Sequence, residues 1–114
     1  MKHSMKLNNG PYNNILYGKK DIEMRLYDEK RRNINIGDII NFTNISTLEN
    51  FDVEVVNIHR YSDFNDLYKS FDKQRLGYNK DDKANPDDMK KYYSEEDIRK
   101  YGVVGIEIKN RFYK

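Results

Sequence analysis

Apolar and polar residues alternate at every position along residues 21–27, a pattern typical of a strand with one face on a core. The aliphatic face is formed by Ile22, Met24 and Leu26, and the polar face by Asp21, Glu23, Arg25 and Tyr27. This pattern predicts a half-buried strand on which Glu23 and Arg25 project to the same side, with Cα atoms about 7 Å apart. These two side chains can therefore contact each other or share a ligand.

Three further segments have the short length and β-branched composition of strands. They are residues 39–42 (IINF), residues 51–58 (FDVEVVNI) and residues 103–112 (VVGIEIKNRF). Residues 43–50 (TNISTLEN) are predicted to form the loop or hairpin that connects the first two. Gly105, inside the last segment, indicates a β-bulge or a close approach of another element.

Two segments have the spacing of helices that pack on a core. A short helix is predicted from Pro11, at its first position, to the residue before Gly18. A second helix follows a cap at Asp63, and its apolar face consists of Phe64, Leu67, Tyr68 and Phe71. We interpret this apolar face as core packing.

The remaining segments are short and polar. Brief helices are predicted after caps at Asn85 and Ser94, where acidic residues occupy the first turn. Residues 28–33 (DEKRRN) are interpreted as a turn, and residues 77–84 (GYNKDDKA) as a polar loop.

The order of these elements favours an α+β fold. A helix, at least three strands, a helical insertion and a final strand suit a small, mostly antiparallel β-barrel flanked by short helices. The final strand is expected to close the sheet, because an exposed edge rich in Val and Ile would invite aggregation. The length of 114 residues fits a single domain over residues 1–114.

The composition excludes several classes of site. The chain has no Cys and two His, so a disulfide framework or a thiolate metal site is excluded, and we expect no metal and no cofactor. No apolar run suits a signal peptide or a membrane span, which predicts a cytoplasmic protein without a membrane partner. The abundance of Asn and Ile suggests an AT-rich bacterial genome. The sequence leaves the oligomeric state open.

Positive charge is concentrated near the polar strand face. Residues 1–32 carry eight Lys or Arg against four acids, whereas the rest of the chain carries thirteen against fifteen. Lys20 can reach the same side as Glu23 and Arg25 from the end of the first helix, and these three groups together could hold and polarise an amide or a phosphate. The same spacing also fits a surface ion-pair cluster that binds nothing.

Two further groups could serve a nucleic-acid ligand. The triplet Lys30, Arg31 and Arg32 could contact phosphates, although a solvated turn explains it equally well. Tyr27 and Tyr93 could offer faces on which bases stack, and tyrosines also pack at core margins with the hydroxyl in water.

Three blocks of the sequence resemble the ASCH domain, a member of the PUA-like superfamily. The blocks are GKKDIEMRL at residues 18–26, NIGDIINF at residues 35–42 and YYSEEDIRKYGVVGIEI at residues 92–108. The family motif Gly-x-Lys-x-x-Glu-x-Arg is matched by Gly18, Lys20, Glu23 and Arg25. The resemblance implies a small β-barrel with a cleft lined by this motif. Through the family's similarity to RNA-binding PUA domains, it also implies RNA or a nucleotide-like small molecule as the partner.

The residues expected to bind that ligand are Lys20, Glu23, Arg25, Tyr27, Lys30, Arg32 and Tyr93. An alternative follows from a branch of ASCH-like proteins that hydrolyses the amide of acetylated cytidine with a Lys, a Thr and a Glu. Lys20 matches that Lys, whereas Glu23 occupies the Thr position, and Asp72 is the acid nearest to the place of the second carboxylate. A small amidohydrolase acting on an N-acylated nucleobase or nucleoside would then use Glu23 as general base and Lys20 to stabilise the oxyanion.

Overall fold

The computed structural model describes residues 1–110. The strands are β1 (Lys2–Leu7), β2 (Ile22–Leu26), β3 (Ile39–Asn44), β4 (Asn50–Tyr61) and β5 (Val103–Lys109). The α-helices are α1 (Asn9–Leu16), α2 (Glu29–Arg32), α3 (Phe64–Ser70) and α4 (Glu95–Tyr101), and the 3-10 helices are η1 (Lys73–Leu76) and η2 (Pro86–Lys91).

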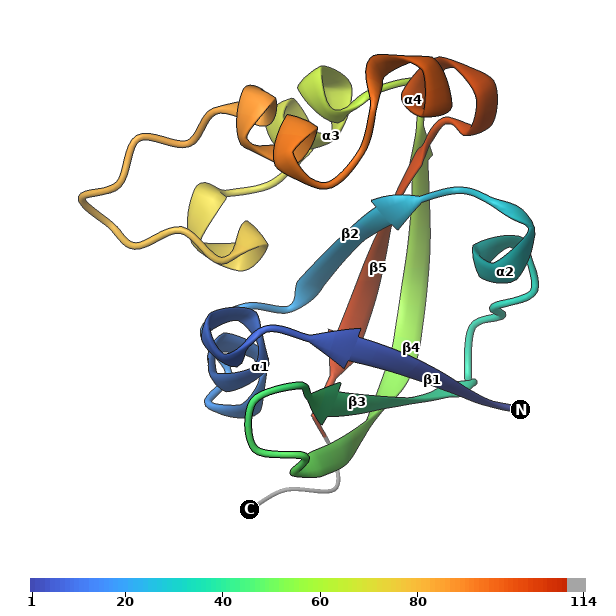
Figure 1. The fold of residues 1–114 in the computed structure, drawn as a ribbon, viewed down its shortest axis with the longest axis vertical. Helices are drawn as coiled ribbons and strands as arrows, with labels where there is room; N and C mark the ends of the chain where they lie inside the picture. Colours follow the sequence, from blue (N-terminus) through green and yellow to red (C-terminus); the bar gives the residue numbers. More distant parts are fainter. Residues whose placement is uncertain (111–114) are drawn as a thin grey trace.

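The strands form one curled sheet in the order β1-β3-β4-β5-β2 (Figure 1). Strands β1 and β3 pair in parallel, and all other neighbours pair antiparallel. α1 lies at one end of the sheet, whereas α3, α4 and the 3-10 helices gather at the other (Figure 1). This architecture confirms the predicted α+β fold with a small, mostly antiparallel, barrel-like sheet flanked by short helices.

Two apolar clusters lie on opposite faces of the sheet. On the inner face, α1 packs with residues of β1, β3, β4 and β5 around the fully buried Phe42. On the other face, Ile22, Met24 and Leu26 pack against Leu67 of α3 and against the 3-10 helices. The polar face of β2 therefore points to the inner side of the sheet instead of to open solvent.

The first strand, β1, was not predicted from the sequence. Its two buried residues are Met5 and Leu7, so the apolar signal in KHSMKL is short. Long-range contacts fix its position instead, because His3 Nε2 lies 2.8 Å from Asp38 Oδ2 at the start of β3. The hydrogen bond with His3 and a second one from the Asn35 backbone N–H lower the pKa of Asp38 to about 2.

Several predicted helix boundaries were wrong. Helix α1 begins at Asn9, so Pro11 occupies its third position, where a missing N–H costs no intrahelical hydrogen bond. Residues predicted as a charged turn form α2, because the Asp28 carboxylate caps the helix by accepting from the Arg31 N–H.

The predicted caps at Asp63, Asn85 and Ser94 are confirmed, each accepting a backbone N–H. The helix after Asn85 has 3-10 geometry.

The last two strands differ from prediction in extent and in the place of the bulge. Strand β4 continues to Tyr61, three residues beyond the predicted end, and its irregularity lies between Val55 and Asn57. Gly105 shows the expected close approach, since a Cβ there would lie 3.1 Å from Ile22 Cγ2, but the bulge is in β4. Strand β5 pairs with both β4 and β2, so the last strand is not left as an exposed edge, as expected, and β1 and β2 form the edges of the sheet. The predicted strand residues Arg111 and Phe112 lie outside the described residues.

Neither a membrane span nor a metal cluster is found in residues 1–110. The helices there are too short and too polar to cross a bilayer. No group of three or more His, Asp or Glu side chains in this part of the chain is placed to hold a metal ion.

Candidate functional site

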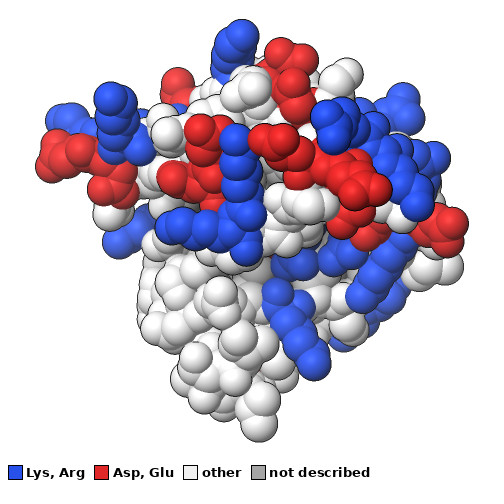
Figure 2. All heavy atoms as spheres, turned by 45° about the horizontal axis from the view of Figure 1, so that its top comes forward, with Lys and Arg blue, Asp and Glu red and all other residues white. Residues whose placement is uncertain are grey.

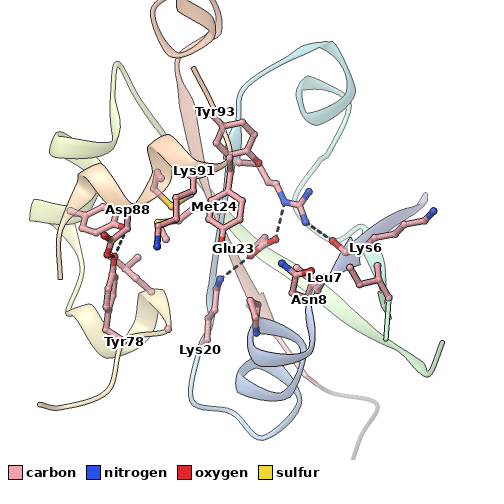
Figure 3. A pocket seen from close by; sticks show the side chains of 18 residues that line it. Lys6, Leu7, Asn8, Lys20, Glu23, Met24, Tyr78, Asp88, Lys91 and Tyr93 are labelled. Carbon is pink, nitrogen blue, oxygen red and sulfur yellow. Dashed lines mark hydrogen bonds and ion pairs between the residues drawn. The ribbon is translucent and has the colours of Figure 1, made fainter. Parts of the chain in front are cut away.

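A cavity of about 470 Å³ opens between the two edge strands and the 3-10 helices (Figure 3). Its charged side chains are Lys6, Lys20, Arg25, Lys91, Glu23 and Asp88. Its aromatic side chains are Tyr68, Tyr78, Tyr92 and Tyr93, and aliphatic residues such as Met24, Leu76 and Met89 complete the wall. The lining thus combines four cationic groups, two carboxylates and flat aromatic surface.

A buried carboxylate lies between two cations in this cavity. Glu23 Oε1 is 3.1 Å from Lys20 Nζ, and Glu23 Oε2 is 2.8 Å from Arg25 Nε (Figure 3). Glu23 is 3% exposed and Lys20 is 8% exposed. The structure therefore brings together Lys20, Glu23 and Arg25 as the sequence predicted, and it shows a buried cluster in place of a solvated surface pair.

This burial follows from the curl of the sheet. In the register with β5, Glu23 is opposite Ile106 and Arg25 is opposite Val104, two residues of the inner apolar cluster. Strand β2 was predicted to be half-buried, yet four of its residues are buried and Arg25 is partly so. The prediction was wrong in this respect because the polar side of β2 faces the same side of the curled sheet as the inner apolar cluster.

Arg25 also bridges the two edges of the sheet. Its Nη2 donates to the backbone carbonyl of Lys6 over 3.1 Å (Figure 3). Lys6 belongs to β1 and Arg25 to β2, the strands at the two ends of the sheet order. The guanidinium thus spans the seam between the edge strands, beside the mouth of the cavity.

The charges in the cluster support each other. Burial alone would raise the pKa of Glu23, but attraction to Lys20 and Arg25 outweighs it, so the pKa of Glu23 falls below its usual value. Burial disfavours the charged form of Arg25, and the Glu23 carboxylate reverses this, so the pKa of Arg25 is raised. Glu23 is therefore an anion with both oxygens engaged, which makes it a weak base.

Lys20 is positioned by α1 and by a glycine. Its backbone N–H donates to the Asn14 carbonyl over 3.0 Å, and the Asn14 side chain donates to the Gly77 carbonyl over 3.4 Å. Gly77 has a φ of 107°, and a Cβ there would lie 3.2 Å from Lys20 Cδ. The lysine stem therefore runs across a surface that glycine leaves open.

The wall opposite Lys20 holds a chain of hydroxyl groups and a carboxylate. The hydroxyls of Tyr68 and Tyr78 are 2.9 Å apart, and the Tyr78 hydroxyl donates to Asp88 Oδ2 over 2.7 Å (Figure 3). Burial and hydrogen bonds to both neighbours raise the pKa of Tyr78. This chain connects α3, the loop after η1 and η2.

Tyr93, a predicted stacking residue, lines the cavity, but one face of its ring already packs against another side chain. It stacks on Phe64 with ring centroids 6.0 Å apart and an interplanar angle of 18°. Burial raises the pKa of its hydroxyl, and the nearby Arg25 opposes that shift. One face of the half-buried ring therefore packs on the core.

Three of the proposed ligand-binding residues lie outside the cavity. Tyr27 is half-buried beneath two guanidinium groups, with Arg32 Cζ 5.0 Å and Arg60 Cζ 5.4 Å from its ring centroid. Arg32 also donates to the Tyr27 carbonyl, and Lys30 is exposed on α2. Asp72, the proposed second carboxylate of a hydrolase, is exposed next to η1 and does not line the cavity either.

Other lining residues were missed by sequence analysis. Tyr68 was interpreted as core because its spacing matched a helical apolar face, and Asp88 was interpreted as a first-turn acid of a helix. Tyr78 and Gly77 lay in a segment interpreted as a polar loop, and Lys91 carried no pattern. Their approach to β2 depends on how η1 and η2 fold back over the sheet, which no local pattern encodes.

Known proteins match the chain over nearly its whole length. A family model described as the ASCH domain matches residues 5–112. The crystal structure of hypothetical protein PH0355 is 37% identical, with a TM-score of 0.77, covering 96% of this chain and 98% of that one. The solution structure of protein PF0455 from Pyrococcus furiosus is 35% identical, with a TM-score of 0.73, covering 99% of this chain and all of that one (100%).

A more distant match concerns the fold alone. The crystal structure of a mutant of ZmASCH from Zymomonas mobilis is 15% identical, with a TM-score of 0.61, and covers 95% of this chain and 67% of that one. A comparison with curated proteins finds no match. The bacterial source and the cytoplasmic location stay predictions, and the relative from Pyrococcus furiosus is archaeal.

Proposed function

The chain belongs to the ASCH domain family, and we propose that its cavity binds RNA or a nucleotide-like ligand. The observation that carries this proposal is the buried Lys20–Glu23–Arg25 cluster at the wall of a cavity lined by four tyrosines. The family's similarity to RNA-binding PUA domains supports the same class of ligand.

The cluster keeps hydrogen-bond donors for a ligand. Lys20 has three N–H donors, and its ion pair with Glu23 uses one of them. Arg25 uses Nε for Glu23 and one Nη2 donor for Lys6, and its guanidinium also hydrogen-bonds with the Tyr93 side chain, which leaves part of the guanidinium for a ligand. Glu23 therefore holds the two cations in fixed positions, from which the remaining donors can contact a phosphate or a base carbonyl.

The rest of the cavity suits a flat, polar ring. Its volume of about 470 Å³ falls in the range of small-molecule sites, which are commonly about 300–1,000 Å³. Tyrosine faces and aliphatic side chains offer stacking and apolar contact to a base, which is favourable for every base because each has a π face. The half-exposed Ile45 and the exposed Tyr92 extend this surface at the rim.

The protein is expected to attract an anion mainly at short range, through the cations of the cavity. On the face shown in Figure 2, acidic and basic side chains intermingle over the helical end, and the opposite end is largely uncharged. The formal net charge of the chain is +2. Long-range steering of nucleic acid is therefore weak, and we expect modest affinity that depends on the excess of cations in the cavity.

The amidohydrolase alternative gains no support from this geometry. A general base works best with a pKa near the operating pH, whereas the pKa of Glu23 is lowered and both its oxygens are ion-paired. Asp72 lies outside the cavity. Turnover of acetylcytidine by the pure protein, lost in Lys20→Ala and Glu23→Gln, would nevertheless establish a hydrolase.

Binding of a short single-stranded RNA, followed by fluorescence anisotropy at several salt concentrations, tests the proposal. We expect salt-sensitive binding that Arg25→Ala weakens by about tenfold or more, the loss expected for a hydrogen bond to a charged group. Arg99→Ala is the matched control, because Arg99 is exposed on α4 and does not line this cavity.

Thermal unfolding of both variants separates loss of contact from loss of fold. Binding that is equally strong in Arg25→Ala and in wild type, or that ignores salt, would contradict the proposal. The salt dependence of the wild-type protein provides this test even if Arg25→Ala folds poorly.

A further inference from the structure

The hydroxyl chain on the wall opposite Lys20 has a defined direction. The Tyr78 hydroxyl has one hydrogen, and its neighbours Asp88 Oδ2 at 2.7 Å and the Asn85 carbonyl at 3.3 Å are both acceptors. Tyr78 therefore donates toward Asp88 or Asn85, and Tyr68 must be the donor in its 2.9 Å contact with Tyr78. Both hydroxyl hydrogens are used within the wall.

As a result, the hydrogen-bonded groups Tyr68, Tyr78 and Asp88 offer only acceptors to the cavity. The free sites are the lone pairs of the Tyr68 oxygen and the remaining lone pairs of the Asp88 carboxylate. Asp88 is partly buried, and within residues 1–110 it takes part in no ion pair. A partly buried carboxylate without a cation is best satisfied by a ligand that donates hydrogen bonds.

The two walls therefore differ in hydrogen-bonding character. Lys20 and Arg25 present donors, whereas Asp88 and Tyr68 present acceptors, with Lys91 as the one cation that η2 adds to the lining. Between them, Met24, Leu76 and Met89 line the cavity with apolar surface. A phosphate or a base carbonyl suits the first wall, whereas an amino group suits the second.

We propose that Asp88, held by Tyr78, selects nucleotides whose base carries an exocyclic amino group. The amino group of cytosine, adenine or guanine donates to the Asp88 carboxylate, a pairing that acidic side chains make with the cytosine amino group in nucleic-acid complexes. Uracil has a carbonyl oxygen where cytosine has its amino group, and this oxygen would repel the carboxylate. Hypoxanthine has a hydrogen on carbon where guanine has its 2-amino group, which leaves the carboxylate without a donor. This inference rests on the proposed function, because it assumes that a nucleotide occupies the cavity.

Two pairs of nucleotides test the amino group. Guanosine and inosine 5′-monophosphates differ only by the 2-amino group, whereas cytidine and uridine 5′-monophosphates differ in the exocyclic group at C4 and in the hydrogen on N3. Titrations monitored by NMR on the full chain should give at least about fivefold tighter binding of the amino-bearing member in one or both pairs. The wild-type ratio needs no variant and so does not depend on the folding of a mutant.

The Asp88→Asn variant tests the assigned residue. The amide oxygen of Asn still accepts the Tyr78 hydroxyl, but its NH₂ group replaces an acceptor by a donor. In this variant, the ratio of the two affinities in each pair should fall to about one, or uridine 5′-monophosphate should bind more tightly than cytidine 5′-monophosphate. Asp87→Asn is the matched control, because Asp87 is the adjacent residue, is exposed, does not line the cavity and should leave the preference unchanged.

The outcomes separate this inference from the proposed function. Equal binding of all four nucleotides would overturn the role of Asp88 while nucleotide binding stands. If no nucleotide and no RNA bind, both proposals fail.

Discussion

Removing the negative charge of Glu23 should destabilise the protein strongly. The substitution Glu23→Gln keeps the shape of the side chain but leaves Lys20 and Arg25 next to each other without an anion. The ion-paired side chains of Lys20, Glu23 and Arg25 are 9%, 4% and 16% exposed, so water cannot replace the lost partner. Breaking a buried ion pair in this way costs about 3–5 kcal/mol.

Such a loss is a large share of the total stability of a domain, which is commonly about 5–15 kcal/mol. Urea unfolding followed by circular dichroism measures it, and thermal unfolding gives a second reading. With about 4 °C of Tm per kcal/mol for a chain of this size, the Tm should fall by about 12–20 °C. Asp87→Asn serves as the control, because its ion pair with Lys90 is exposed and contributes little.

A triple variant separates the charge effect from packing. Replacing Lys20 by Met, Glu23 by Leu and Arg25 by Met removes all three charges, and apolar replacement of a buried ionic cluster is often neutral or stabilising. The triple variant should therefore recover most of the stability lost in Glu23→Gln, yet fail to bind RNA. A Glu23→Gln effect no larger than that of Asp87→Asn would refute the account of a dry, mutually dependent cluster.

Three further predictions concern other parts of the chain. Gly105→Ala should lower the free energy of unfolding by about 1–3 kcal/mol, because its Cβ would lie 3.1 Å from a core methyl group. Gly10→Ala in α1 should stabilise the helix, because its Cβ would have no neighbour within 4 Å. Urea titration of both variants measures the difference. The pKa of Asp38 is lowered from 3.8 to about 2, so the ionised carboxylate stabilises the fold above about pH 4, and this contribution is lost as the pH falls toward 2. The free energy of unfolding, measured against pH, should therefore decline less steeply in Asp38→Asn than in the wild type. Gly77→Ala should weaken RNA binding because the added methyl would lie 3.2 Å from Lys20 Cδ and displace the lysine side chain, and it should also lower the Tm because Ala is strained at a φ of 107°. Anisotropy and melting curves measure the two effects, and unchanged binding would count against the placement of Lys20.

The local pattern of β2 was sufficient to predict the cluster but not its burial. Strict alternation placed Glu23 and Arg25 on one face, and the spacing brought Lys20 to the same side, as the ion pairs of 3.1 and 2.8 Å show. Whether that face meets solvent depends on the curl of the sheet and on the other edge strand. The Arg25 contact with the Lys6 carbonyl joins residues 19 positions apart, which periodicity cannot reveal.

The opposite wall of the cavity could not be predicted for the same reason. Asp88 has the sequence features of a helix cap region, and Tyr78 those of a loop, so each had a sufficient local explanation. Their hydrogen bond and the contact with Tyr68 arise when η2 folds back over α3 and the loop after η1. Strand β1 was missed because its position depends on parallel pairing with β3, which lies more than 30 residues away in the chain.

The central claim is that the hollow between the edge strands receives the ligand, and NMR mapping of a ¹⁵N-labelled sample tests it most directly. Titration with a short single-stranded RNA at low salt should shift the amide signals of Lys20, Glu23, Arg25, Gly77 and Tyr93. Shifts confined to Lys30–Arg32 of α2, with those cavity signals unmoved at saturation, would contradict the account.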